Sequence, residues 1–310
     1  MYFPVFRTKT YELMAMRQLA ALIARNNIIP IIEPVVPAPR LQTSLDAFVE
    51  AEMLFCLVVN PMWPRRDAAA LTPAQVHEQI VLTFLDEVDN FFPTMYVDED
   101  TTLVSVEEFI ERYEPMNLDR VYFLTGEPRA RVLEAMVNDD PTYIAFGGNV
   151  ADGTRDRFPL ERRVLIEDRF KRVRNSDYPP QEFFSDRHRT IPNADYSHFG
   201  DYSIVGADFQ EGGAAPYAVA IHHMIVRGAA EHLYLKHYIS DSNATQTDTG
   251  GKFLEALEKL IADLPTLGAE NETSATHEYI ALHGDQHYPG LGHLKRLGIK
   301  QHVEVLSRLL

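Results

Sequence analysis

Short apolar runs recur along the chain, and several of them end in a polar residue. The clearest is Ile28 to Val35, I-I-P-I-I-E-P-V, in which Glu33 follows a run rich in β-branched residues. Such a run predicts a strand that is buried on both faces, as in parallel sheets, so a carboxylate is expected only where the strand ends. Similar runs end in the following polar residues: Asn60, Thr125, Glu167 with Asp168, and Asp208. Buried strands that each deliver a polar group at the carboxyl end are typical of an α/β barrel or a doubly wound sheet.

Segments with helical spacing of apolar residues lie between these runs. A helix is predicted over about 10–25, and it separates a β-prone segment at 2–6 from the run at 28–35. Thr72 followed by Pro73 predicts the start of a long helix that continues to about Phe91. The other predicted strands are 54–60, 94–97, 121–125, 143–146, 164–166 and 204–208. We therefore expect one α/β domain over 1–310, a TIM-like (β/α)8 barrel.

Two parts of the chain depart from this alternation. Residues 171–201 are irregular, and we expect them to form an insertion in the barrel. Residues 277–310 form a C-terminal extension that ends in a short amphipathic helix. Two further apolar runs, 217–226 and 233–239, are each an alternative closing strand of the barrel, so the strand count is open by one or two.

Composition and charge narrow the setting. No apolar run approaches the roughly 18 residues of a membrane helix, and the N-terminal segment lacks the profile of a secretory signal, so we expect no membrane association. The single cysteine, Cys56, lies inside an apolar run, which suits a reducing cytoplasm. The formal net charge of −16 opposes non-specific nucleic-acid binding and is compatible with a basic protein partner or with a local basic pocket.

The polar strand ends form the main candidate site. If the predicted strands lie side by side, these side chains meet at one mouth of the barrel. Convergent carboxylates can hold Mg²⁺ or share a proton for acid–base chemistry, which makes Mg²⁺ the candidate cofactor. The alternative is that they cap loops and pair with nearby cations. The candidate catalytic residues are Glu33, Asn60, Glu167, Asp168 and Asp208.

Cationic residues form a second group of candidates. Some lie in the irregular segment, where charged, aromatic and glycine residues together are typical of a ligand-binding loop; the alternative is a long surface excursion. The candidate ligand-binding residues are Arg7, Lys9, Arg187, Arg189, Lys236 and His237.

Histidines gather near the end of the chain. The spacing of His283-Gly-Asp-Gln-His287 resembles that of metal ligands. A zinc site needs at least three protein ligands in fixed geometry, and no cysteine cluster supplies the others. We expect surface or capping roles for these residues, which are His277, His283, His287, His293 and His302.

Several segments resemble a known family. The opening Y-F-P-V-F-R-T-K-T-Y-E-L-M-A-M, followed by I-I-P-I-I-E-P, resembles the phage and bacterial "beta protein" family, in particular a bacterial branch of about this length. The resemblance extends through F-G-D-Y-S, E-G-G-A-A-P-Y-A-V-A-I-H-H and K-H-Y-I-S-D-S. It implies a barrel-like α/β fold and, by analogy with the satellite-phage beta protein, a role in anti-phage defence or in neutralising a toxic partner. The implied partner is a toxin or a nuclease-like product of a neighbouring gene.

Two functions therefore stay open. The first is a cytoplasmic component of a defence or toxin-immunity system that binds a partner protein, with a ligand at the barrel mouth as a gate. The second is a Mg²⁺-dependent hydrolase or lyase that acts on a phosphorylated or nucleotide-like substrate at the C-terminal face of the barrel.

Overall fold

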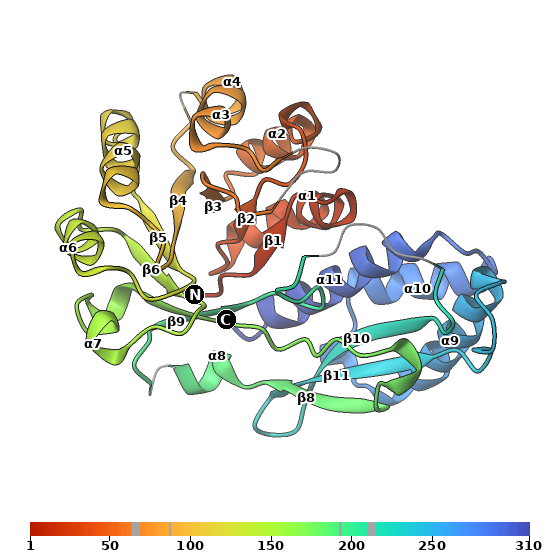
Figure 1. Cartoon of the computed structure of the whole chain (residues 1–310). Helices are drawn as coiled ribbons and strands as arrows, with labels where there is room; N and C mark the ends of the chain where they lie inside the picture. Colours follow the sequence, from red (N-terminus) through yellow and green to blue (C-terminus); the bar gives the residue numbers. More distant parts are fainter. Residues whose placement is uncertain (64–68, 87, 192–193, 210–214) are drawn as a thin grey trace. The chain divides into compact units, whose positions relative to one another are not determined.

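A computed structural model describes residues 1–63, 69–86, 88–191, 194–209 and 215–310 (Figure 1). Pro64, in the loop after Trp63, and 211–214, in a segment that carries the family resemblance, lie outside the described residues. The chain forms two compact units, whereas the apolar pattern predicts a single barrel domain over 1–310. The first, the barrel unit, consists of Met1–Leu13, Ala20–Glu167 and Arg187–Asp201. The second, the sheet–helix unit, consists of Met14–Leu19, Asp168–Asp186 and Tyr202–Leu310.

Eight parallel strands make up the core of the barrel unit (Figure 1). They are β1 Val5–Arg7, β2 Ile31–Glu33, β3 Phe55–Val58, β4 Phe91–Val97, β5 Val121–Leu124, β6 Tyr143–Phe146, β7 Arg163–Glu167 and β9 His198–Asp201. Their order in the sheet follows their order in the chain. A parallel bridge between Tyr2 and Phe199, with a hydrogen bond from Phe3 N to Phe199 O (2.8 Å), brings β9 against the start of the chain. The expected (β/α)8 barrel is confirmed.

The eighth strand lies elsewhere than the apolar pattern predicts. β9 belongs to the segment 171–201 that was expected to be irregular, while residues 204–208 form a turn and a bend. The predicted strand over 204–208 is therefore wrong. Gly200 allows β9 to pack here, because a Cβ at this position would lie only 2.0 Å from the backbone oxygen of Phe3.

Helices alternate with these strands. They are α1 Thr10–Arg25, α2 Gln42–Glu50, α3 Pro73–Val76, α4 Leu82–Phe84, α5 Leu103–Tyr113, α6 Ala130–Asn138, α7 Asp152–Arg155 and α8 Arg187–Thr190. A π-helical turn, His77–Val81, joins α3 to α4. Thr72 caps α3 as predicted, in a capping box with Gln75. The helix ends at Phe84 rather than near Phe91, because Phe91 begins the fully buried strand β4.

The sheet–helix unit contains an antiparallel sheet in the order β10-β11-β8. Its elements are β8 Gln181–Ser185, β10 Ala220–Arg227, β11 His232–Ile239, α9 Thr249–Asp263, α10 Ser274–Gly284 and α11 Leu291–Ser307. The two runs that were alternative closing strands of the barrel form the hairpin β10–β11 of this sheet. Ile221 and Tyr238 of the hairpin pack with Phe253, Leu257 and Leu297 of the helices in one buried core. None of the helices in the described ranges is long and apolar enough to cross a membrane.

Candidate functional site

Glu33 ends β2 and is buried in the barrel unit, with only 1% of its surface exposed. Its register partner on β1, Arg7, places Nε 3.4 Å from Glu33 Oε2. The backbone N–H groups of Met62 and Trp63 donate to Oε1 at 2.9 and 3.3 Å. The hydroxyl of Tyr96, from β4, donates to Oε2 at 3.5 Å. The last residue of β1, the loop after β3 and the penultimate residue of β4 thus converge on one carboxylate at the end of β2: these are Arg7, Met62 with Trp63, and Tyr96.

The surroundings of Glu33 act on its protonation in opposite directions. Burial raises the pKa of the carboxyl, and this effect outweighs the lowering by the Arg7 charge and by the hydrogen bonds from Met62, Trp63 and Tyr96. The net result is a pKa above the ordinary value for a glutamate. A carboxyl with a raised pKa at the C-terminal end of a barrel strand is characteristic of functional sites.

Asn60 joins the ends of β3 and β4. Its Nδ2 donates to Tyr96 O at 2.9 Å, and Tyr96 N donates to its Oδ1 at 2.8 Å. The side-chain amide therefore continues the backbone ladder, whose preceding bond runs from Val59 N to Thr94 O (2.9 Å). These hydrogen bonds hold in place the end of β4, from which the Tyr96 hydroxyl donates to Glu33.

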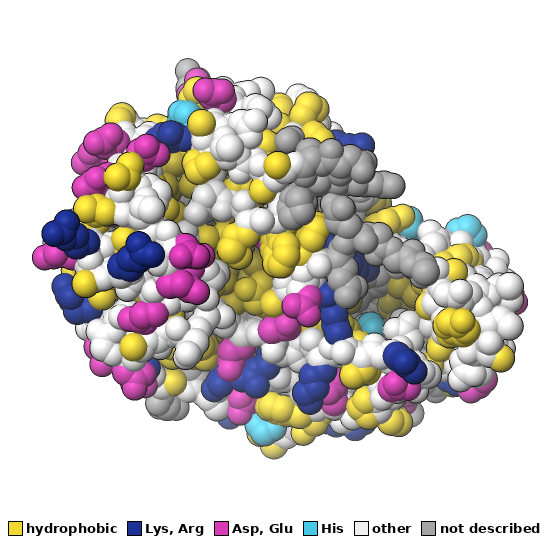
Figure 2. All heavy atoms as spheres, viewed as in Figure 1, with side chains coloured by type: hydrophobic (Ala, Val, Ile, Leu, Met, Phe, Trp, Pro, Cys, Tyr) yellow, Lys and Arg dark blue, Asp and Glu magenta, His cyan; other side chains and the backbone are white. Residues whose placement is uncertain are grey.

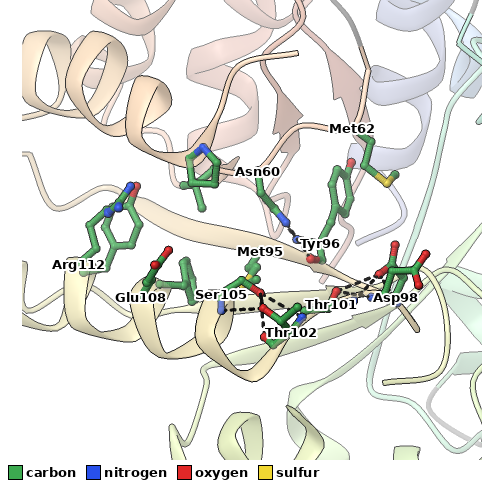
Figure 3. Close-up of a pocket in the computed structure, with 15 residues that line it drawn as sticks. Asn60, Met62, Met95, Tyr96, Asp98, Thr101, Thr102, Ser105, Glu108 and Arg112 are labelled. Atoms are coloured by element: carbon green, nitrogen blue, oxygen red, sulfur yellow. Dashed lines mark hydrogen bonds between the residues drawn. The ribbon is translucent and has the colours of Figure 1, made fainter. Parts of the chain in front are cut away.

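A cavity of about 370 Å³ adjoins this cluster over β4 and α5 (Figure 3). Its apolar wall includes Val59, Met95 and Phe109. Met62 and Tyr96 also line it, so two of the residues that donate to Glu33 face the cavity as well. Hydrophobic side chains also gather in a hollow on the face of the molecule shown in Figure 2, with acidic side chains beside it.

Glu167 does not share this site. The register that runs from Tyr96 across β5 and β6 reaches Val164 in β7. Glu167 lies three residues after Val164, so its side chain points to the opposite face of the sheet from Tyr96. There it forms a two-pronged ion pair with Arg187, at 2.6 Å from Nε and 2.9 Å from Nη2. The opposite orientation separates it from Glu33.

The other two candidate carboxylates belong to the sheet–helix unit. Asp168 accepts hydrogen bonds from the backbone N–H groups of Phe170 (3.2 Å) and Ala207 (2.9 Å), which is a loop-capping role. Asp208 is exposed in a bend, so the expectation that it ends the eighth strand is wrong. The structure therefore brings only Glu33 and Asn60 of the five candidates into one cluster.

Among the cationic candidates, Arg7 forms an ion pair with Glu33. Lys9 is the residue before α1, at its N-cap position, and Arg189 is exposed in α8. In the sheet–helix unit, Lys236 forms an ion pair with Asp263. Arg7, Arg187 and Lys236 therefore each pair with a carboxylate, which is the alternative to a ligand-binding role.

His237 belongs to a polar cluster on the sheet of the second unit. Its Nδ1 lies 2.7 Å from Nδ1 of His222, its partner on β10, and its Nε2 lies 3.3 Å from Glu182. Burial lowers the pKa of His237, while Glu182 acts in the opposite direction. The neutral ring is then able to accept a hydrogen bond on one nitrogen and donate one from the other.

No metal centre emerges from the described residues, since none of their His, Cys, Asp and Glu side chains form a group of three that could hold an ion. Glu33 and Glu167 each face an arginine instead of each other. Of the histidines near the end of the chain, His277 and His283 each lie 2.6 Å from a glutamate.

Tyr96 and Met62 are site residues that the polar strand ends do not indicate. Tyr96 lies two residues after Thr94 in the predicted strand 94–97, so strand alternation places it on the same face as Thr94. Met62 contributes its backbone N–H, and no side-chain pattern signals such a contact.

No family model matches the chain, and no curated protein matches it in sequence. Among solved structures, the chain is similar to tryptophan synthase from Mycobacterium tuberculosis, with 11% identity and a TM-score of 0.41 over 66% of this chain and 83% of that chain. The barrel assignment rests on the strand order and register given above rather than on this likeness.

Proposed function

We propose that the barrel unit is a small-molecule receptor in which Glu33 senses the ligand. The supporting observation is that Met62 and Tyr96 both line the cavity and both donate to the Glu33 carboxylate. A ligand that moves either residue changes the hydrogen bonds to a buried carboxylate and therefore its pKa, because each such bond favours the charged form. The cavity volume, about 370 Å³, lies within the range of roughly 300–1,000 Å³ that is usual for small-molecule sites.

The receptor acts, in this proposal, in cytoplasmic anti-phage defence or toxin immunity by binding a partner protein. The resemblance to the beta protein family supports this setting, and the net charge of −16 suits a partner with a basic surface. The partner is a toxin or a nuclease-like product of a neighbouring gene. Ligand occupancy at the barrel mouth controls whether that partner is bound.

The variant Tyr96→Phe tests the proposal, because it removes the hydroxyl that bonds Glu33 and keeps the ring. We expect a melting temperature within a few degrees of the wild type and a several-fold change in the recovery of the partner from cells that carry the neighbouring genes. The exposed Tyr217→Phe is the matched control. Wild-type protein that is recovered alone and gives no protection contradicts the proposal.

The second candidate is a hydrolase or lyase acting on a phosphorylated or nucleotide-like substrate. The raised pKa of Glu33 favours it, because a carboxyl that holds its proton closer to neutral pH can act as a general acid. Mg²⁺ remains part of this candidate, since substrate phosphates commonly supply some of its ligands. A turnover assay with phosphorylated and nucleotide substrates decides between the two. An enzyme shows turnover as wild type and loses it in Glu33→Gln at an unchanged melting temperature, whereas a receptor shows no turnover even as wild type.

A further inference from the structure

The end of the cavity away from Asp98 has a distinct chemistry. Figure 3 shows Arg112 at one end and Asp98 at the other, with Glu108 and Ser105 of α5 between them. Tyr113, the last residue of α5, lines the cavity beside Arg112. His77, the first residue of the π-helical turn, packs edge-on against the Tyr113 ring, with 5.5 Å between the ring centroids.

Two polar atoms of residues that line this end, Arg112 Nη1 and Tyr113 Oη, are buried without a hydrogen-bond partner among the described residues. The same is true of Nδ1 of His77, which packs behind Tyr113 and does not line the cavity. Tyr113 itself is only 1% exposed. Glu108, one turn before Arg112 on α5, also lines the cavity, yet no ion pair joins these two within the described chain. Buried polar groups in native proteins are nearly always paired, so unpaired donors beside a cavity indicate an acceptor supplied from outside the chain.

The polar groups at the opposite end have their partners within the chain. Asp98 Oδ1 accepts from the backbone N–H groups of Asp100 and Thr101 and from the Thr101 hydroxyl, each at 3.0 Å. Thr102 and Ser105 satisfy each other in the capping box of α5. Unpaired hydrogen-bonding capacity is therefore concentrated at Arg112 and Tyr113.

We propose that Arg112 and Tyr113 bind the carboxylate of an organic acid whose apolar group fills the rest of the cavity. This inference rests on the receptor function proposed above and names its ligand class. The guanidinium and the phenol hydroxyl both donate, and a carboxylate accepts from both. The apolar group packs against Val59, Met95 and Phe109.

A carboxylate fits better than a phosphate monoester. Among the described residues that line the cavity, Arg112 is the only cation, and the same wall carries Asp98, Asp100 and Glu108. A monoanion is neutralised by one arginine, whereas a dianion is repelled by the three carboxylates. His77 adds no positive charge, because burial, followed by the charge of Arg112, lowers the pKa of its ring.

Calorimetric titration of the full-length protein tests this inference. The probes are aryl and acyl carboxylates from benzoate to decanoate, each with its uncharged amide, and phenyl phosphate. We expect at least one acid to bind about tenfold or more tightly than its amide and than phenyl phosphate. Arg112→Gln should weaken that acid about 10- to 100-fold, and Tyr113→Phe several-fold. The exposed Arg131→Gln on α6 is the matched control and should leave binding unchanged.

The outcomes separate this inference from the receptor proposal. The melting temperatures of Arg112→Gln and Tyr113→Phe should not fall, because the atoms removed have no partners to lose. Acids and amides that bind equally, or an Arg112→Gln variant with wild-type affinity, overturn the carboxylate assignment while leaving the cavity as a ligand site. If no probe binds at millimolar concentration, the carboxylate assignment fails, whereas the receptor proposal fails only if Tyr96→Phe leaves the recovery of the partner unchanged.

Discussion

Asn60 is the side chain that fixes the geometry around Glu33. It exchanges two hydrogen bonds with the backbone of Tyr96, and Tyr96 in turn reaches the Glu33 carboxylate. An amide is the one side-chain group that offers both a donor and an acceptor in the spacing of a peptide unit. The role of Asn60 at this point is therefore tied to the amide itself.

The variant Asn60→Asp should lose about 1–3 kcal/mol of stability, because a carboxylate accepts from Tyr96 N but faces Tyr96 O without a proton to donate. Urea unfolding at pH 7 measures the loss. Asn243→Asp, at an exposed loop position, provides the comparison and should stay within about 0.5 kcal/mol of the wild type. Equal stabilities of the two variants would show that the amide bridge contributes nothing.

Single residues of the site differ in how far the sequence reveals them. Glu33 and Asn60 are visible because a polar residue interrupts an apolar run, and burial in a parallel strand leaves few places for it. Arg112 and Tyr113 look like ordinary positions of an amphipathic helix, and their distinguishing property is that Nη1 and Oη have no hydrogen-bond partner in the described part of the chain. Whether a side chain has a hydrogen-bond partner depends on how distant segments pack, and the spacing of apolar and polar residues along the chain does not show this.

At the scale of elements, barrel closure depends on β9. The strands β2 to β7 coincide with apolar runs, and their order follows the rule that consecutive parallel strands joined through a helix lie side by side with a right-handed connection. β9, H-F-G-D, is short and half polar, so it lacks the apolar signal, while the apolar Ile204 and Val205 belong to a turn. Pairing with β7 along four residues and a bridge to Tyr2, rather than apolar content, make 198–201 a strand.

Gly200→Ala should disrupt this closure. The added methyl group would lie 2.0 Å from Phe3 O and 2.6 Å from Ile166 Cδ1, so backbone has to move. We expect a loss of about 3 kcal/mol or more in the free energy of unfolding. Gly153→Ala in α7, where a Cβ meets nothing within 4 Å, is the control and should be neutral or slightly stabilising. Matching melting temperatures would mean that β9 is not needed to complete the barrel.

At the scale of the whole molecule, the division into two units is the feature furthest from the sequence pattern. Both units draw on separate stretches of chain, and six residues of α1, Met14–Leu19, group with the second unit. β10 and β11 contain apolar runs like those of the barrel strands, but with histidines and a lysine between them. Their antiparallel pairing depends on the tight connection around Gly228, which the barrel alternation does not predict.

Each unit contains a histidine that is neutral in the folded protein because burial lowers its pKa. The free energy of unfolding therefore depends on pH. Burial lowers the pKa of His198 in the barrel unit to about 4 and that of His223 in the sheet–helix unit to about 3. The unfolded value is about 6.5, so between these values the unfolded chain binds protons that the folded chain does not. Each histidine therefore lowers stability by up to about 1.4 kcal/mol per pH unit as the pH falls below about 6.5. Glu33 acts in the opposite sense, since its raised pKa removes stability as the pH rises past 4.5.

His223→Phe should reduce this acid sensitivity. Both ring nitrogens of His223 are buried without partners among the described residues, and the ring packs edge-on against Tyr238 and Tyr279. Phenylalanine keeps this packing and removes the two unpaired atoms, so stability at pH 7 should be equal or higher. Between pH 7 and pH 5 the variant should lose about 2 kcal/mol less than the wild type, as measured by urea unfolding at both values. The exposed His287→Phe serves as control and should keep the wild-type pH dependence; equal losses in all three proteins would show that His223 is not protonated on unfolding.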